Sequence, residues 1–168
     1  MEIIVSCWFG FYYMGIYVLD ISSNTFLPVP VLADTEELPG VDYQVTNNSY
    51  QTMTIFNDKT GFSEKINLEE ILTANYAKKK PYISYSEDEY KNAYNSSDSD
   101  SCYVTYWSGR YSIEMYEEQE CLVLEQPITG AWGRNDGIGF VETGMRWNEE
   151  GNCELLFSRY ALPDKHDS

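Results

Sequence analysis

The only histidine lies where a catalytic base is unexpected. His166 belongs to the charged C-terminal segment 163–168, and chain ends commonly fray. Nucleophilic catalysis by a Ser–His or Cys–His pair needs a base held in place beside the nucleophile. We therefore expect no catalytic site of this kind, and we expect removal of residues 163–168 to leave function intact.

Carboxylates are the other groups that could carry chemistry. The chain has 27 Asp and Glu residues, and two carboxylates at a suitable separation form the catalytic pair of a glycosidase. With so many carboxylates, some pairs reach that separation by chance, so the sequence singles out no catalytic pair. An Asp/Glu-dependent carbohydrate-active enzyme is kept as an alternative, as is a carbohydrate-binding β domain with aromatic platforms.

No spacing of residues predicts a metal or cofactor site. The segment 95–101, with Asp98 and Asp100, lacks the glycine and the terminal glutamate of a calcium loop. The glycines of residues 130–140 fit neither dinucleotide-binding nor Walker spacing, and they predict turns and bulges between strands. No C-x-x-C pair occurs, so free thiols in a reducing compartment are expected. The four cysteines are Cys7, Cys102, Cys121 and Cys153.

The charge is strongly negative and unevenly distributed. Eleven Lys and Arg against 27 Asp and Glu give a net charge of -16. Residues 1–57 contain six acids and no base, and residues 92–168 contain fourteen acids and five bases. Such a chain lacks the clustered bases needed for direct binding to nucleic acid or to an anionic membrane. The first base is Lys59, so a secretory signal is not expected and a cytoplasmic location is predicted.

Acidic residues beside tyrosines indicate a protein-binding surface. Tyrosine is common at interface hot spots, and acid clusters speed association with a basic partner. Residues 114–125 carry five glutamates, Glu125 included, and no Lys or Arg, so we expect the interface there first. The predicted partner-binding residues are Glu114, Tyr116, Glu117, Glu118, Glu120, Asp98, Asp100, Asp34, Glu36 and Glu37.

Most of the chain has the composition of β-strands, and its 168 residues favour one acidic globular domain spanning 1–168. Residues 43–56 are expected to form one or two strands broken at Asn47–Asn48, and turns are expected at 58–61, 108–109, 135–137 and 149–152. Runs of β-branched and aromatic residues predict strands at 3–9, 12–19, 26–32, 43–56, 62–66, 102–107, 110–116, 120–124, 138–142 and 153–160.

Two helices are predicted between these strands. The first spans 67–79, where Asn67 and Glu70 have capping-box spacing and Pro81 follows the end. The second begins at Ser86, with Glu89 as its capping partner, and runs to about residue 94. The fold class expected is α+β, mostly antiparallel β-sheet with one or two short helices inserted near the middle.

Charge and composition together predict a small inhibitor that binds a basic protein and is not an enzyme. Its partner would be a nuclease or another nucleic-acid-binding effector. In size and charge alone the chain resembles two classes of protein: phage anti-defence proteins of the anti-CRISPR or DNA-mimic kind, and immunity proteins that neutralise toxic nucleases. No motif connects the chain to a named family in either class, and the sequence leaves the oligomeric state open.

Overall fold

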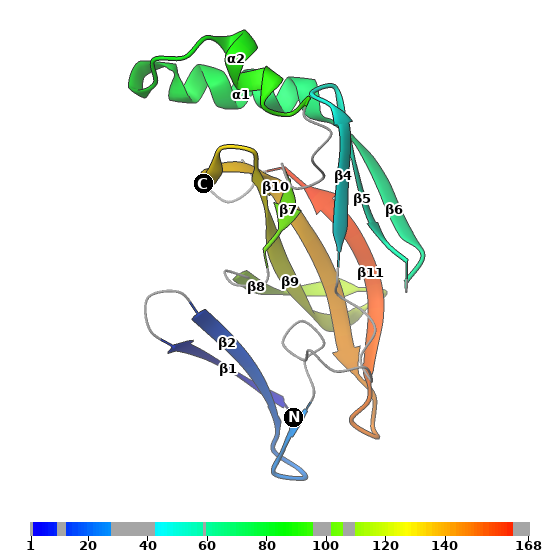
Figure 1. Cartoon of the computed structure of the whole chain (residues 1–168). Helices are drawn as coiled ribbons and strands as arrows, with labels where there is room; N and C mark the ends of the chain where they lie inside the picture. The colour runs from blue at the N-terminus through cyan, green and yellow to red at the C-terminus, as the bar shows by residue number, and fades with distance from the viewer. Residues whose placement is uncertain are drawn as a thin grey trace. The chain divides into compact units, whose positions relative to one another are not determined.

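The computed structural model describes residues 2–9, 13–27, 43–58, 60–95, 102–105 and 110–162 (Figure 1). Contacts group the chain into two compact units. Unit 1 comprises residues 1–42, 105–126 and 141–159, and unit 2 comprises residues 43–104, 127–140 and 160–168. The expectation of a single domain stays a prediction, because a grouping of contacts does not test it.

The N-terminal part of unit 1 is a three-stranded antiparallel sheet, as its aromatic and β-branched composition predicts. The strands are β1 (Glu2–Phe9), β2 (Tyr13–Asp20) and β3 (Thr25–Leu27), in the order β1-β2-β3. At the end of β2, the Asp20 carboxylate accepts hydrogen bonds from Ser22 and Ser23. These bonds, those from the serine side chains foremost, hold the pKa of Asp20 well below its usual value.

A five-stranded sheet contributes strands to both units. Its strands run in the order β11-β10-β9-β7, and β8 also pairs with β9. Pro127, which has no N–H to donate, lies in β9 between the stretch paired with β8 and the stretch paired with β7. The strands are β7 (Tyr103–Val104), β8 (Arg110–Tyr116), β9 (Gln119–Gly130), β10 (Gly133–Trp147) and β11 (Cys153–Ala161).

The core of unit 1 lies between these two sheets. Leu122 and Leu124 of β9 project to one face, since alternate residues of a strand share a face. They pack with Val18 of β2 and Met145 of β10. Burial of each such side chain stabilises the fold by about 1.5–3 kcal/mol. This cluster therefore holds β2 against β9 and β10.

Unit 2 contains an antiparallel meander followed by the helices. The meander consists of β4 (Gln44–Ser49), β5 (Thr52–Asn57) and β6 (Phe62–Asn67). The chain then forms α1 (Leu68–Lys79), the short 3-10 helix η1 (Lys80–Tyr82) and α2 (Glu87–Asn92). The buried side chains of this unit come from both the meander and the helices, and they include Met53, Ile55, Leu68, Leu72, Tyr90 and Tyr94.

One predicted helix cap is confirmed and one is wrong. Ser86 Oγ accepts from the Glu89 N–H at 3.2 Å, and Glu89 accepts in return from the Ser86 N–H at 2.7 Å, so α2 begins with a capping box. Asn67 precedes α1 but makes no side-chain cap bond. It is the last residue of β6 and pairs with Thr52, so its position is set by the sheet.

One predicted turn is wrong, and one predicted break is an irregularity within a strand. The break expected at Asn47–Asn48 is a register shift within β4, and the chain reverses at Tyr50–Gln51. Residues 135–137 lie inside β10, and the reversal falls at Ala131–Trp132. The structure as a whole is mostly antiparallel β-sheet with two short helices, as predicted.

Two further findings concern membrane-spanning helices and the cysteines. Among the helices of the described ranges, none is long and apolar enough to cross a membrane. Cys102, Cys121 and Cys153 form no disulfide with one another in the described part of the chain, and the expectation of free thiols stays a prediction.

Candidate functional site

The hairpin formed by β8 and β9 carries all five of the described residues that were predicted to bind a partner. Tyr116 pairs with Gln119, which leaves Glu117 and Glu118 as a two-residue turn. Their φ angles are 49° and 66°, the positive values that a type I′ turn requires. Asparagine and glycine are the residues this turn favours, and here both positions are glutamates.

Exposed acidic and apolar side chains meet at the end of this hairpin. Glu117, Glu118 and Glu120 are exposed, and no ion pair within the described ranges involves any of them. Met115 and Ile113 of β8 are 64% and 52% exposed. We call these five residues the hairpin tip. It combines three negative charges with two apolar side chains on one short element.

Glu114 and Tyr116 point elsewhere. Glu114 accepts from Arg159 Nη2 of β11 at 3.0 and 3.1 Å, and the Tyr116 ring lies 5.2 Å from the ring of Phe157. Arg159 also donates through Nε to the buried carboxylate of Glu142. The expectation that residues 114–125 have no compensating base is therefore wrong for Glu114, because a distant strand supplies one.

Glu125 does not contribute to the negative surface either. It faces Arg110 across the β8–β9 pairing, and its side chain is buried. The reason is its position well inside the sheet, six residues from the turn-flanking Gln119. The remaining predicted residues, Asp34, Glu36, Glu37, Asp98 and Asp100, lie outside the described residues, as does His166.

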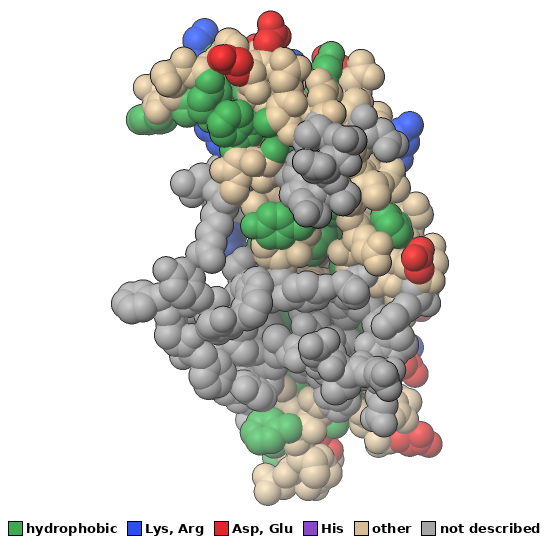
Figure 2. All heavy atoms as spheres, in the orientation of Figure 1, with side chains coloured by type: hydrophobic (Ala, Val, Ile, Leu, Met, Phe, Trp, Pro, Cys, Tyr) green, Lys and Arg blue, Asp and Glu red, His purple; other side chains and the backbone are tan. Residues whose placement is uncertain are grey.

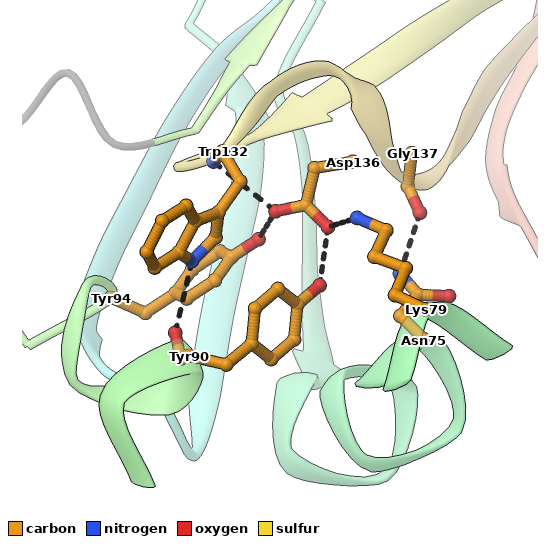
Figure 3. Close-up of polar contacts among 7 residues, drawn as sticks. All are labelled: Asn75, Lys79, Tyr90, Tyr94, Trp132, Asp136 and Gly137. Carbon is orange, nitrogen blue, oxygen red and sulfur yellow. Dashed lines mark hydrogen bonds and ion pairs between the residues drawn. The ribbon is translucent and has the colours of Figure 1, made fainter. Parts of the chain in front are cut away.

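A second constellation, in unit 2, centres on Asp136 (Figure 3). The carboxylate of Asp136 is buried. It accepts from Lys79 Nζ at 2.5 Å, from the backbone N–H of Trp132 at 3.2 Å, and from the hydroxyls of Tyr90 and Tyr94. An ionised carboxylate offers about four acceptor sites, and these four donors occupy them.

Further bonds fasten the same β9–β10 turn to the helices. Asn75 Nδ2 of α1 donates to the Gly137 carbonyl at 2.8 Å, and Trp132 Nε1 donates to the Tyr90 carbonyl at 3.2 Å. The Trp132 ring stacks on Tyr85 with centroids 4.3 Å apart. We call Asp136 and its donors, with these two bonds, the Asp136 latch.

Burial keeps the phenols of the latch protonated. Removal from water, followed by the hydrogen bonds to Asp136 and its charge, raises the pKa values of Tyr90 and Tyr94 far above the usual value of a phenol. Both hydroxyls are thus donors at neutral pH. With its acceptor sites filled by fixed donors, Asp136 has no capacity left for a substrate, and the chemistry that the latch supports is structural.

Sequence reasoning missed the latch. The Asn135-Asp136-Gly137 stretch has turn composition, and nothing local shows that its aspartate is buried. The one usable signal was the spacing of Tyr90 and Tyr94, which places two phenols on one face of a helix. Their shared acceptor lies more than forty residues away in the sequence.

No metal-binding group of three or more His, Cys, Asp or Glu side chains occurs among the described residues, and the expectation of no metal and no cofactor stays a prediction. The comparisons with known proteins give no assignment: no family model, no curated protein and no solved structure matches the chain.

Proposed function

We propose that this protein is a small acidic inhibitor that binds a basic protein through the hairpin tip. Binding there would cover the partner's nucleic-acid-binding or catalytic surface. The observation that supports the proposal is the β8–β9 turn, which holds two exposed glutamates in backbone conformations that favour asparagine and glycine.

The backbone of the turn has an energetic cost that a role for its side chains would explain. A left-handed conformation costs an ordinary L-residue about 1–2 kcal/mol, and strained positions concentrate at functional sites. Replacement by asparagine and glycine would relieve the strain but remove both carboxylates. The presence of glutamates at both positions of this turn, Glu117 and Glu118, is therefore the feature that a binding role accounts for.

The composition of the hairpin tip suits a basic protein surface. Interfaces combine an apolar centre with polar surroundings, and Met115 and Ile113 supply apolar area beside the three glutamates. Methionine adapts its shape to different partners. A net charge of -16 would also steer a positively charged partner toward the complex and raise the association rate.

The partner classes that fit are nucleases and other nucleic-acid-binding effectors, because their working surfaces gather Lys and Arg. Neutralisation of a toxic nuclease and inhibition of a defence effector of the CRISPR type would use the same chemistry. In both roles the protein acts by binding in the cytoplasm and carries out no reaction of its own.

Association kinetics with matched charge variants test the proposal. The wild-type protein is used to capture its partner from a lysate of the source organism, and binding is remeasured with purified components. The test variant combines Glu117→Lys, Glu118→Lys and Glu120→Lys. The control combines Asp58→Lys, Glu149→Lys and Glu150→Lys, all exposed and outside the hairpin tip. Each set replaces three negative charges by three positive ones, so both variants have a net charge of -10 against -16.

We expect the test variant to associate at least about tenfold more slowly at low salt, with a flatter salt dependence. The control should lose only the smaller, long-range part of the steering. Equal losses in the two variants would show that total charge, and not the hairpin tip, determines binding, and the proposed site would be wrong.

A second function is favoured by the aromatic surface of unit 2. Figure 2 shows hydrophobic side chains over the helices. Tyr82 of η1 is 88% exposed, and Trp132 of the β9–β10 turn, which stacks on Tyr85, is 41% exposed. Exposed aromatic rings can bind sugar rings, which supports the carbohydrate-binding alternative. Titration with a panel of oligosaccharides while tryptophan fluorescence is recorded would test it: a saturable change that Trp132→Ala abolishes supports it, and no change rejects it.

A further inference from the structure

The outer edge of β8 offers a row of backbone groups. In the five-stranded sheet β8 pairs with β9 only, and no other strand of the described ranges pairs with it. Edge strands are usually protected from unwanted pairing by lysine, proline, a bulge or very short length. β8 has seven residues, Arg110–Tyr116, and contains neither proline nor lysine. Its charged residues are Arg110 at the start of the strand and Glu114, which is paired with Arg159. It is thus an edge at which an extended chain could add.

The register of the hairpin shows which backbone groups face outward. In a hairpin with a two-residue turn, the flanking pair, here Tyr116 and Gln119, exchanges backbone hydrogen bonds, and pairs alternate from there. Glu114 and Ser112 accordingly bond to β9. The N–H and C=O groups of the odd-numbered residues, Tyr111, Ile113 and Met115, point to the free edge.

The side chains along this edge define what an added strand would meet. Ile113 and Met115 lie on one face, about 6.6 Å apart at about 3.3 Å per residue, and more than half of each side chain is exposed. Beyond Met115 the strand ends at the exposed Glu117 and Glu118. An incoming strand would therefore meet two apolar positions followed by negative charge.

We propose that β8 binds an extended segment of the basic partner by strand addition. The segment has apolar side chains at alternate positions over Ile113 and Met115, with Lys or Arg beside Glu117 and Glu118. Main-chain hydrogen bonds give such a complex affinity, and side-chain pockets and charges give it specificity. The inference rests on the proposed function, since it names how the partner of the hairpin tip is held.

Charge favours this occupant over a second copy of the chain. Pairing of two β8 edges would bring together two molecules of net charge -16, which repel each other. A basic segment instead relieves the repulsion among the glutamates of the hairpin tip. The chemistry of the edge, apolar and ending in acids, complements a strand that is apolar and ends in bases.

The test uses amide hydrogen exchange, observed by NMR, on the whole protein. The probe is a synthetic peptide in which two lysines precede alternating threonine and valine. The control peptide has the same sequence but is N-methylated at alternate residues on the edge that would face β8. At a peptide concentration ten times its dissociation constant, we expect the Tyr111, Ile113 and Met115 amides to exchange about tenfold more slowly. The amides of Ser112, Glu114 and Tyr116, already bonded to β9, should be unchanged, and the methylated peptide should give no protection.

A pair of variants keeps the test independent of peptide affinity. Ile113→Pro removes one outward N–H without breaking a bond to β9, because proline is tolerated where the N–H faces solvent. Ile113→Thr retains that N–H while removing the apolar side chain. With circular dichroism confirming that both fold, proline should weaken binding of the captured partner more than threonine does.

Three results would overturn strand addition. One is binding of peptide and partner without protection of the odd-numbered amides. Another is equal loss of partner binding in the proline and threonine variants. The third is protection of the same amides that appears without peptide and rises with protein concentration, since this would make a second copy the occupant. Loss of partner binding in the triple lysine variant, together with unprotected amides, would leave the hairpin tip as the site and reject only the edge.

Discussion

Glu117 and Glu118 lower the stability of the fold, whereas the proposed function requires them. Their left-handed backbone angles cost free energy that glycine does not pay, and their side chains extend into solvent, where they stabilise nothing in the described structure. In the proposed complex the same two carboxylates contact Lys and Arg of the partner. Stability and binding should therefore respond in opposite directions to substitution at this turn.

The double variant Glu117→Asn with Glu118→Gly tests that opposition. We expect the free energy of unfolding to rise by about 1 kcal/mol, because the new residues adopt a type I′ turn readily. Chemical denaturation measures this gain. Association with the captured partner should become slower at the same time. A variant that is less stable, or that binds as well as wild type, contradicts this explanation of the turn.

Individual side chains also show what the sequence can and cannot predict. The exposure of Glu117, Glu118 and Glu120 follows from their place at a strand end, which composition reveals. The pairing of Glu114 with Arg159 does not, because the two residues are 45 positions apart and meet only through the folding of the sheet. The burial of Glu125 likewise depends on how far β9 extends, and strand length is poorly encoded by composition.

Among the elements, the β9–β10 turn depends on the Asp136 latch for its attachment to α1 and α2. Gly130 permits this arrangement: a Cβ there would lie 2.1 Å from the Tyr94 hydroxyl oxygen and 2.7 Å from Asp136 Oδ2. Both atoms are buried and hydrogen-bonded, so neither can move aside freely. Gly137, in the same segment, has open space around its Cβ position and serves as a control.

Gly130→Ala should lower the free energy of unfolding by about 1–3 kcal/mol, the usual cost of an extra group in a packed site. Gly137→Ala should change it by less than about 0.5 kcal/mol, as substitutions away from packed features do. Thermal unfolding of both variants, followed by circular dichroism, measures the difference. Equal stability of the two variants would mean that the latch does not hold the turn as described.

The elements that sequence reasoning located best are those specified locally. The capping residues Ser86 and Glu89 lie within one helical turn, and α2 begins where they predict. The turn expected at 135–137 does not form, because the structure of these residues is determined by distant parts of the chain. Its composition favours reversal, but burial of the Asp136 carboxylate by donors from α1 and α2 keeps these residues within β10, and no local pattern contains that information.

At the scale of the whole molecule, a thiol and several phenols removed from water make the free energy of unfolding decrease at alkaline pH. Burial raises the pKa of the Cys153 thiol to about 12, and it raises those of the Tyr90, Tyr94 and Tyr160 phenols above the usual range. In the unfolded chain these groups ionise near their ordinary values, about 8.5 for a thiol and about 10 for a phenol. The unfolded chain therefore loses protons first as pH rises.

The contribution of these groups to the free energy of unfolding should accordingly be constant below about pH 8 and fall progressively above it. Each group adds up to about 1.4 kcal/mol per pH unit once its unfolded form is ionised. Melting temperatures measured from pH 7 to 11 test this, with Tyr90→Phe as a variant whose decline should be shallower above about pH 10. Ionisation of the Tyr90, Tyr94 and Tyr160 phenols while circular dichroism still shows a folded chain would contradict the expectation.

The most direct test of the proposed inhibition is competition with nucleic acid for the partner. The captured basic protein is first bound to a fluorescently labelled nucleic acid, and the acidic protein is then added while fluorescence anisotropy is followed. We predict release of the nucleic acid at about one equivalent of wild-type protein, and little release by the triple lysine variant at Glu117, Glu118 and Glu120. A complex that holds the partner, the acidic protein and the nucleic acid together, with anisotropy maintained, would contradict the claim that this protein blocks a nucleic-acid-binding surface.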